Sequence, residues 1–362
     1  MSQESTPYGN LSSNATPENV RPDQGDAPTP AAADAPLRAD TPLRATNQLI
    51  GHARTELGRV IAGQRPVIEE VLMAVLCQGH ALLEGVPGIA KTLIVKALGR
   101  LLGLGFQRVQ ATPDLMPADI LGTSILRPGS DTFSFHAGPV FTDLLLVDEI
   151  NRMPPRTQAA LLECMEERQV TSDGVRRPLP PWFTVFATQN PVDFEGTYPL
   201  PEAQLDRFMF NVVMDYLPEN DEVSVVTRTT SEAASPIEAL LSGQDVLRFH
   251  EMVRKVPVAE EMVRYAVKLA AASRPHQLGA PDFINEWASW GAGTRAGQFL
   301  VLGAKARALF KGRAHVTTAD IQALAFPTLR HRILLNYRAE AEGISVEDVI
   351  KKLVEAVKAP LQ

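Results

Sequence analysis

Residues 80–92 read HALLEGVPGIAKT, and this stretch decides the fold. Residues 80–84 form a short apolar run, and residues 91–102 then carry apolar side chains at helical spacing. The small residues between them let backbone N–H groups wrap around phosphate groups, where the start of a helix adds favourable positive potential. The order strand, loop, helix is the context that a phosphate-binding loop requires.

The residue types in this loop suit nucleotide chemistry. Lys91 can reach the β and γ phosphates as a point charge, and the Thr92 hydroxyl can ligate Mg²⁺. Ala90 stands where the general pattern has glycine, at a slight cost if the backbone there is helical. The alternative is a glycine-rich turn followed by a chance Lys-Thr pair, which the flanking strand and helix disfavour.

Residues 144–149 read LLLVDE, an apolar strand that ends in two adjacent carboxylates. A strand that ends at the carboxyl edge of an α/β sheet delivers its last side chains to the place where such sheets bind ligands. Asp148 would hold Mg²⁺ through its water shell, and Glu149 would orient and deprotonate an attacking water. Alone, such a pair more often marks an ordinary strand end, but beside a phosphate loop it indicates hydrolysis.

A third apolar strand, residues 184–188, is followed by Gln189, Asn190 and Pro191. Asn190 would lie at the same edge of the sheet, where its amide could hydrogen-bond the γ-phosphate or the water. A turn-forming Asn-Pro pair explains these residues equally well when they are taken alone.

Two arginines are further candidates for the site. Arg207, within LPEAQLDRF, could enter the pocket of a neighbouring subunit and stabilise charge on the transferred phosphoryl group. Arg295 lies in the first turn of a predicted helix, where a cation opposes the helix dipole, and this placement indicates an anionic partner. For either arginine taken alone, a surface ion pair with a carboxylate is the better explanation.

The pattern along the chain predicts an α/β domain followed by a smaller helical one. Further strand candidates at 106–110, 144–147 and 184–187 are apolar at their centres, which predicts a mainly parallel sheet covered on both faces. After Pro218, helices are expected at 245–256, 259–273, 294–310 and 318–333, with Thr294 and Thr317 or Thr318 as N-caps. We therefore expect a P-loop αβα domain at 47–216 and an all-α lid domain at 217–362.

The N-terminal residues 1–46 have a different composition, dominated by Pro, Ala, Asp, Ser, Asn and Thr. They contain hardly any large apolar side chain and cannot bury enough surface to offset the entropy of ordering. A disordered tail is expected, and a docking or regulatory arm is the less favoured alternative.

Charge and composition exclude several classes of protein. The formal net charge of -7 argues against nonspecific nucleic-acid binding. Cys77 and Cys164 lie in separate apolar segments, which favours a reducing compartment, and the run 330–332 (Arg-His-Arg) is expected to be charged surface rather than part of a transition-metal site. Without a long apolar stretch or a signal pattern, we expect a cytoplasmic protein that does not insert into membranes.

Together these motifs resemble the MoxR family of AAA+ ATPases, in the branch with an insertion in the second helix. The similarity runs from about Thr46 to the end of the chain. It is densest in GVPGIAKT, in ATPDLMPADILG from Ala111, in LLLVDEINRMPPRTQAALLECMEERQVT from Leu144, and in ATQNPVDFEGTYPLPEAQLDRF from Ala187. The family typically has alanine at the position of Ala90, whereas GAGTRAG around Arg295 departs from its usual proline before the arginine.

The resemblance implies a role for each site residue. Lys91, Thr92, Asp148 and Glu149 would have their usual Walker roles, with Asn190 as first sensor, Arg207 as trans-acting finger and Arg295 as second sensor. Ile61, Gly63 and Gln64 would border the adenine, and the rest of the nucleotide site would be lined by Gly85, Val86, Pro87, Gly88, Ile89, Ala90 and Leu93. Residues 118–137 would be the insertion and 169–177 a hairpin, both facing the pore or the client.

The function that the resemblance implies is hydrolysis of ATP with Mg²⁺ in a ring that is expected to be homohexameric. Such a ring would act as a chaperone-like factor that activates or matures a protein complex, often beside a partner with a von Willebrand factor type A domain. The alternatives are a magnesium-chelatase ATPase subunit, a DNA-remodelling helicase, and a nucleotide-gated scaffold that binds a partner without hydrolysis. The acidic net charge disfavours the helicase.

Overall fold

The fold comes from a computed structural model of the 362-residue chain, which describes residues 42–126, 133–190, 196–231 and 237–360. These residues belong to one compact unit. The tail expected at 1–46 lies almost entirely outside the described residues. None of the helices in the described residues is long and apolar enough to cross a membrane.

The centre of the ATPase part is a five-stranded sheet with the strand order β2-β5-β8-β1-β9. All neighbouring strands in it are parallel, which confirms the predicted sheet. Because the strands are parallel, their carboxyl ends share one edge, and β1, β5 and β8 end there beside one another. The strands are β1 (Ala81–Glu84), β2 (Phe106–Gln110), β5 (Leu144–Asp148), β8 (Thr184–Gln189) and β9 (Phe210–Val213).

Apolar side chains cover both faces of this sheet. Along β5, Leu144 and Leu146 belong to one buried cluster, whereas Leu145 and Val147 belong to another. This alternation follows from the two-residue period of a strand and gives the αβα layers that the sequence predicts. The first cluster includes α1 (Pro42–Val60), α2 (Arg65–Leu76) and α3 (Lys91–Leu101), and the second includes α5 (Pro155–Glu167).

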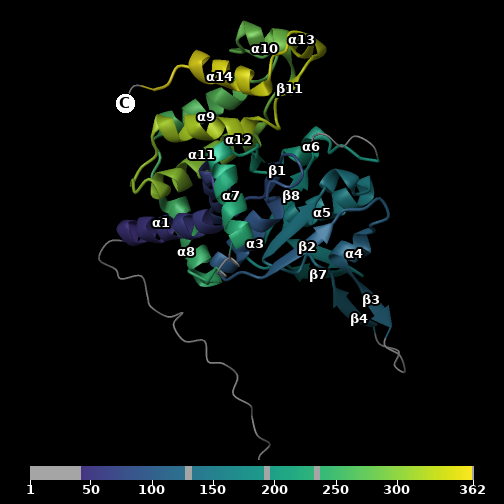
Figure 1. The fold of residues 1–362 in the computed structure, drawn as a ribbon. Coiled ribbons are helices and arrows are strands. Elements are labelled where there is room, and N and C mark those ends of the chain that lie inside the picture. Colours follow the sequence, from purple (N-terminus) through teal and green to yellow (C-terminus); the bar gives the residue numbers. More distant parts are fainter. Residues whose placement is uncertain (1–41, 127–132, 191–195, 232–236, 361–362) are drawn as a thin grey trace, which may run out of the picture. The chain divides into compact units, whose positions relative to one another are not determined.

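Two antiparallel hairpins accompany the sheet, where the insertion and the second hairpin are predicted. After the short helix α4 (Pro117–Leu121), β3 (Gly122–Leu126) pairs with β4 (Phe133–Ala137). The second hairpin joins β6 (Gln169–Ser172) to β7 (Val175–Pro178) directly after α5. Figure 1 shows β3 and β4 extending away from the central sheet.

The C-terminal part is mainly helical, as predicted. Helix α11 has the predicted bounds, but its N-cap is Gly293 rather than Thr294, because the backbone of Gly293 is extended and Thr294 is already helical. Thr317 caps α12 as expected, in a capping box with Asp320. The elements are α7 (Glu219–Ser231), α8 (Gly243–Lys255), α9 (Glu260–Ala272), α10 (Asp282–Trp287), β10 (Ala288–Trp290), α11 (Thr294–Phe310), α12 (Thr318–Leu329), β11 (Leu334–Leu335), α13 (Tyr337–Ala341) and α14 (Val346–Ala356).

Candidate active site

The loop between β1 and α3 has the open geometry of a phosphate cradle. Gly88 has a φ of 84°, a left-handed conformation that favours glycine. Apart from Gly88 and its two neighbours in the chain, no described residue has an atom within 4 Å of the position that a Cβ would take on Gly88. The loop therefore has free space beside its backbone, as close approach of a phosphate requires.

Ala90 corrects one expectation. Its backbone is left-handed, with φ 67° and ψ 23°, so it is not in the right-handed helical conformation in which alanine would cost little. The left-handed region costs an L-residue with a Cβ roughly 1–2 kcal/mol. The last loop residue before Lys91 is therefore strained, as residues at functional sites often are.

Lys91 connects the ends of two strands. Its Nζ donates a hydrogen bond to the carbonyl oxygen of Gly85 at 2.5 Å and to that of Gln189 at 3.5 Å. Gly85 follows β1 and Gln189 ends β8, so the ammonium group lies at the carboxyl edge of the sheet. This is where the sequence places a phosphate-binding lysine.

Thr92 and Asp148 bring two side-chain oxygens together at this edge. The Thr92 Oγ1 donates to Asp148 Oδ2 at 3.3 Å, and Asp148 is buried at the end of β5. Thr188 Oγ1 donates to the other carboxylate oxygen of Asp148 at 3.2 Å. A hydroxyl and a carboxylate are hard oxygen ligands of the kind that Mg²⁺ prefers, so the residues present fit this ion.

Arg108 was not foreseen in this site. Its Nε donates to Asp148 Oδ2 at 2.5 Å, from the neighbouring strand β2. The expectation that residues 106–110 are covered on both faces is wrong, because β2 is the edge strand of the sheet and Gln107, Arg108 and Gln110 are exposed. An arginine in the middle of this strand was the available signal.

Glu149 is held by several neighbours. Its backbone, with φ 57°, is left-handed, and its N–H donates to Thr188 Oγ1 at 2.9 Å. Its carboxylate accepts from Gln110 Nε2 at 3.0 Å and pairs with Arg152 at 3.1 Å. Gln110 was also missed, although the β2–β5 register places it opposite Asp148. Both contacts engage the same carboxylate oxygen, Oε2, and the Glu149 side chain is 36% exposed.

Asn190 lies at the same edge. It directly follows β8, is buried, and is the neighbour of Gln189, whose carbonyl accepts from Lys91. The structure thus brings Lys91, Asp148 and Asn190 to the ends of adjacent strands, as the sequence predicts. Pro191 lies outside the described residues.

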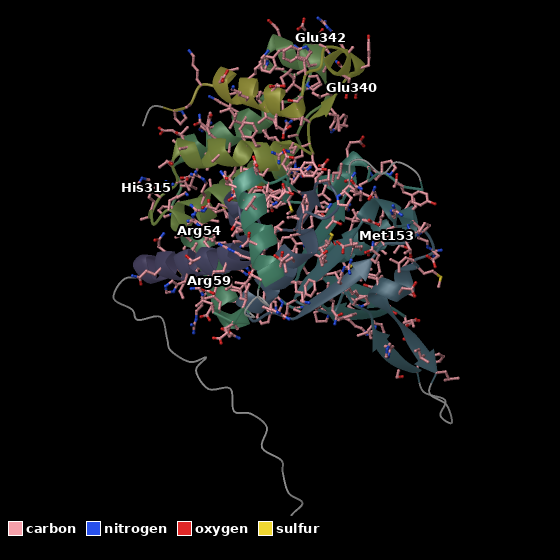
Figure 2. All side chains as sticks on the ribbon, in the orientation of Figure 1. Arg54, Arg59, Met153, His315, Glu340 and Glu342 are labelled. Carbon is pink, nitrogen blue, oxygen red and sulfur yellow. The ribbon has the colours of Figure 1, made fainter. Side chains whose placement is uncertain are left out.

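The residues expected to border the adenine connect α1 and α2. Ile61 and Gly63 line a cavity of about 880 Å³, together with residues of α1, α2 and α7. Arg54 and Arg59 of α1, labelled in Figure 2, also line this cavity. Gln64 is buried, and among the described residues its Oε1 has no hydrogen-bond partner. A buried acceptor without a donor is costly, but Gln64 does not line the cavity, so its oxygen does not indicate a ligand there.

Arg207 and Arg295 lie away from this edge. Arg207 comes just before β9, and the N–H of Met209 donates to the carbonyl of His80, which precedes β1. Since β1 and β9 are parallel, these residues lie at the amino edge of the sheet, opposite the phosphate loop. Within one chain, the two arginines and Lys91 therefore do not form one site.

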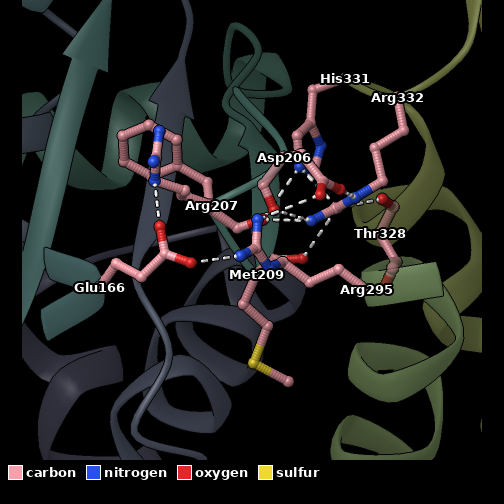
Figure 3. A network of polar contacts seen from close by, with 9 residues as sticks. Glu166, Asp206, Arg207, Met209, Arg295, Thr328, His331 and Arg332 are labelled. Atoms are coloured by element: carbon pink, nitrogen blue, oxygen red, sulfur yellow. Dashed lines mark hydrogen bonds and ion pairs between the residues drawn. The ribbon is translucent and has the colours of Figure 1, made fainter. Parts of the chain in front are cut away.

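Both arginines are paired with carboxylates, which is the alternative that the sequence left open for each (Figure 3). Arg207 Nε lies 2.7 Å from one oxygen of Glu166, and Arg295 lies 2.7 Å from the other. Arg295 also contacts Asp206 at 3.2 Å. The roles of Arg207 and Arg295 toward a nucleotide remain predictions.

The expectation of a charged surface run at 330–332 is wrong for His331 and Arg332, which are 6% and 4% exposed. The Arg332 guanidinium donates to Asp206 Oδ1 at 2.7 Å and to the carbonyls of Phe208 at 2.7 Å and Thr328 at 2.5 Å. Burial lowers the pKa of Arg332 to about 10, which leaves it charged at neutral pH. Arg332 therefore anchors the turn before β9.

Comparisons with known proteins agree with this architecture. Residues 80–210 match the family model of the ATPase family associated with various cellular activities (AAA), and residues 284–353 match the AAA lid domain. The chain is 43% identical to Chaperone MoxR1 of Mycobacterium tuberculosis over 308 residues, which cover 84% of this chain and 81% of the relative. It is 41% identical to the YeaC protein of Bacillus subtilis, over 87% of this chain and 96% of that protein.

A more distant relative and a solved structure match this chain over most of its length. Protein MoxR of Methylorubrum extorquens is 28% identical over 84% of this chain and 93% of its own length. A crystal structure from Cytophaga hutchinsonii, solved at 2.00 Å resolution, superposes with a TM-score of 0.82 at 41% identity and covers 88% of this chain and 97% of that one. The parallel sheet, the phosphate loop, the lid and these relatives together place the chain in the MoxR family of AAA+ ATPases.

Proposed function

We propose that this chain binds ATP with Mg²⁺ and hydrolyses it in a homohexameric ring. The observation that carries the proposal is the grouping of Lys91, Thr92, Asp148 and Glu149 at the carboxyl edge of one sheet, with Thr92 Oγ1 3.3 Å from Asp148 Oδ2. Side chains of these types at this edge have the charge and the oxygen ligands that a nucleotide triphosphate and its metal ion need.

Each residue has a role in this proposal. Lys91 binds the β and γ phosphates, and Thr92 and Asp148 would hold Mg²⁺, which neutralises phosphate charge when bound. Glu149, whose side chain is 36% exposed, takes the proton of the attacking water. Asn190 donates its amide to the γ-phosphate or the water.

The position of Arg207 supports the proposed ring. Its position before β9 separates it from its own phosphate loop by the length of the sheet. A guanidinium that stabilises the transferred phosphoryl group must therefore come from a neighbouring subunit. Arg295 pairs with the same carboxylate as Arg207, that of Glu166. We propose that it also acts at the nucleotide site of the neighbouring subunit.

The chaperone role rests on the relatives and on an exposed hairpin. Chaperone MoxR1 carries that role in its name. In this chain Ile125, Leu126 and Phe133 of β3 and β4 are 50%, 51% and 72% exposed. Leu126 and Phe133 are cross-strand partners on one face of the hairpin, and Ile125 lies on the other face. Exposed apolar side chains of this kind suit contact with another protein. We propose a client protein complex, a partner with a von Willebrand factor type A domain, and a cytoplasmic location.

A nucleotide-gated scaffold is the second candidate. It is favoured by the contacts of Glu149 with Gln110 and Arg152, which both engage Oε2 and fix the orientation of the proposed base. In such a scaffold ATP would bind and change the conformation of the ring without turnover.

The test is steady-state ATP turnover against protein concentration for the wild type, Glu149→Gln and Arg207→Ala, with ATP binding measured separately. We expect turnover per subunit to rise with concentration, and both substitutions to lower kcat at least about 100-fold while ATP binding is retained. A wild-type protein that binds ATP but never turns it over, alone or with a partner, would replace the ATPase by the scaffold.

A further inference from the structure

A chain of alternating charges runs through the amino edge of the sheet (Figure 3). It begins at Arg332, passes through Asp206, Arg295 and Glu166, and ends at Arg207, with closest nitrogen–oxygen distances of 2.7, 3.2, 2.7 and 2.7 Å. These residues come from separate elements, because Glu166 belongs to α5 and Arg295 to α11. Each carboxylate therefore contacts two guanidinium groups whose residues are far apart in the sequence.

We propose that Glu166 and Arg295 are positioning residues for Arg207, and that Arg207 is the member of this network that reaches the nucleotide of a neighbouring subunit. This inference rests on the proposed ring ATPase. It gives Arg295 a role that acts through Arg207, in place of direct contact with phosphate.

The nitrogen atoms of the arginines support this division of roles. Arg207 donates to Glu166 through Nε, and no hydrogen bond to a described residue engages its two terminal nitrogens. Arg295 uses both terminal nitrogens, one for Asp206 and the other for Glu166. A guanidinium binds phosphate in a bidentate manner most readily through a free pair of donors, and Arg207 has that pair.

The network is anchored at its other end. The side chain of Arg332 is 2% exposed, and it fixes Asp206, which in turn holds Arg295. Glu166 is ionised, since the hydrogen bond from Arg207 lowers the pKa of its carboxyl. A long side chain that is already held in one orientation loses less entropy when it enters a neighbouring site. The contacts of Glu166 and Arg295 therefore place Arg207 for contact with the phosphoryl group during transfer, and they have little effect on the affinity for ATP.

The test uses rings mixed from two kinds of subunit. Glu149→Gln subunits cannot hydrolyse but donate Arg207, whereas Arg207→Ala subunits can hydrolyse but donate nothing. Mixing them should restore turnover at interfaces where a Glu149→Gln subunit supplies its Arg207 to the nucleotide site of an Arg207→Ala subunit. Adding Glu166→Gln to the donating subunit should then lower the restored kcat about 10- to 100-fold with the KM for ATP unchanged. Adding it to the receiving subunit should leave the restored kcat unchanged.

Arg295→Ala in the donating subunit should give the same loss as Glu166→Gln, and the double substitution should cost no more than either one. Glu163→Gln, at an exposed acid of the same helix, is the matched control and should leave turnover unchanged. Thermal unfolding and sedimentation of every variant verify that folding and ring size are retained. Glu166→Asp, which keeps the charge, should recover part of the loss.

The outcomes separate this inference from the proposed function. If the mixture never regains turnover, the trans finger itself fails and the positioning role fails with it. If turnover returns but does not respond to Glu166→Gln, or rises with it, the positioning role alone is overturned. Losses from Glu166→Gln and Arg295→Ala that multiply, or a raised KM in Arg295→Ala, would also overturn it, because Arg295 would then meet the nucleotide independently.

Discussion

At the scale of the residue, Ala90 is held in the left-handed region directly before Lys91. Glycine adopts this conformation without strain but has more freedom in the unfolded chain, so two effects of about 1 kcal/mol oppose each other. We expect Ala90→Gly to leave the free energy of unfolding unchanged or to raise it by up to about 1 kcal/mol. Denaturant unfolding measures this difference.

The control for Ala90 is an alanine in a right-handed helix. Ala159 is exposed in α5, where glycine is a poor helix former. Ala159→Gly should lower the free energy of unfolding by about 1 kcal/mol. If Ala90→Gly caused an equal loss, Ala90 would not be left-handed in solution.

A second residue-scale prediction concerns the buried His80. Its Nδ1 accepts from the N–H of Val185 at 2.9 Å and its Nε2 lies 3.1 Å from the carbonyl of Met165, so both nitrogens are used by a neutral ring. Burial, aided by the charge of Arg168, lowers the pKa of His80 to about 3 from 6.5. The unfolded chain takes up a proton below pH 6.5 and the folded chain does not, so His80 contributes stability above pH 6.5 that is lost toward pH 3.

The measurement is the free energy of unfolding of the wild type and His80→Asn between pH 7.5 and 4.5. Asparagine keeps an acceptor for Val185 and does not titrate, so we expect its curve to be shallower by about 1.4 kcal/mol per pH unit below pH 6.5. Burial raises the pKa of Glu70 to about 7, which opposes this slope, but Glu70 is present in both proteins and cancels. Parallel curves would mean that His80 titrates alike in both states.

Single residues also differ in how readily the sequence reveals them. Lys91 and Thr92 were predictable because a loop, a strand and a helix adjacent in the chain fix their surroundings. The contact between Glu166 and Arg295 was not, since 129 positions separate them and only the packing of α5 and α11 brings them together. The strain at Ala90 was missed for a different reason. Alanine is small enough for the loop, but its size does not show that the loop requires a left-handed backbone at this position.

At the scale of the element, the two hairpins contact each other through side chains. Ser124 of β3 donates to Asp173 in the β6–β7 turn, and the Arg177 guanidinium lies 3.9 Å from the centroid of the Phe135 ring of β4. A cation over an aromatic face contributes about 0.5–1 kcal/mol at an exposed site. The β6–β7 hairpin directly follows α5, so these contacts connect α5 to the insertion.

We therefore expect Arg177→Ala to speed amide hydrogen exchange in β3 and β4 several-fold, with global unfolding unchanged. Exchange monitored by mass spectrometry measures this effect. Arg176→Ala is the control, because the Arg176 side chain is exposed and makes no hydrogen bond or ion pair with a described residue, while its backbone stays paired with Thr171. Equal exchange in the two variants would show that the hairpins open independently.

The elements themselves were largely predictable. The strand at 106–110 and the helix at 294–310 have the predicted bounds. For the helix, apolar residues at helical spacing fill the whole run. The first residues of helices were harder to predict. The N-cap of α11 is Gly293, which has no side-chain oxygen to identify it in the sequence, and only its extended backbone marks it as the cap.

At the scale of the whole molecule, one buried cluster spans the ATPase part and the lid. It contains Val71 of α2 and Leu98 of α3 as well as Leu300 of α11 and Leu324 of α12. Helix α11 packs closely against both parts at Gly303, where an added Cβ would lie 2.8 Å from Leu324 of α12 and 3.2 Å from Phe210 of β9. Unfolding the lid would therefore expose the core beneath the sheet, so the two parts should stabilise each other.

This shared core predicts a single unfolding transition, although the boundary expected near residue 216 remains a prediction. Trp182 lies in the ATPase part, although its ring also packs beside Gly243 of α8. Trp287, whose Nε1 donates to Glu342 at 3.0 Å, reports on the lid. Variants that keep only one of these tryptophans, with phenylalanine at the other tryptophan positions, should give the same guanidinium midpoint by fluorescence. Gly303→Val should lower both midpoints together, because its side chain would meet both parts. Separate midpoints would mean that the lid folds independently, and the contacts at Gly303 would then not couple it to the sheet.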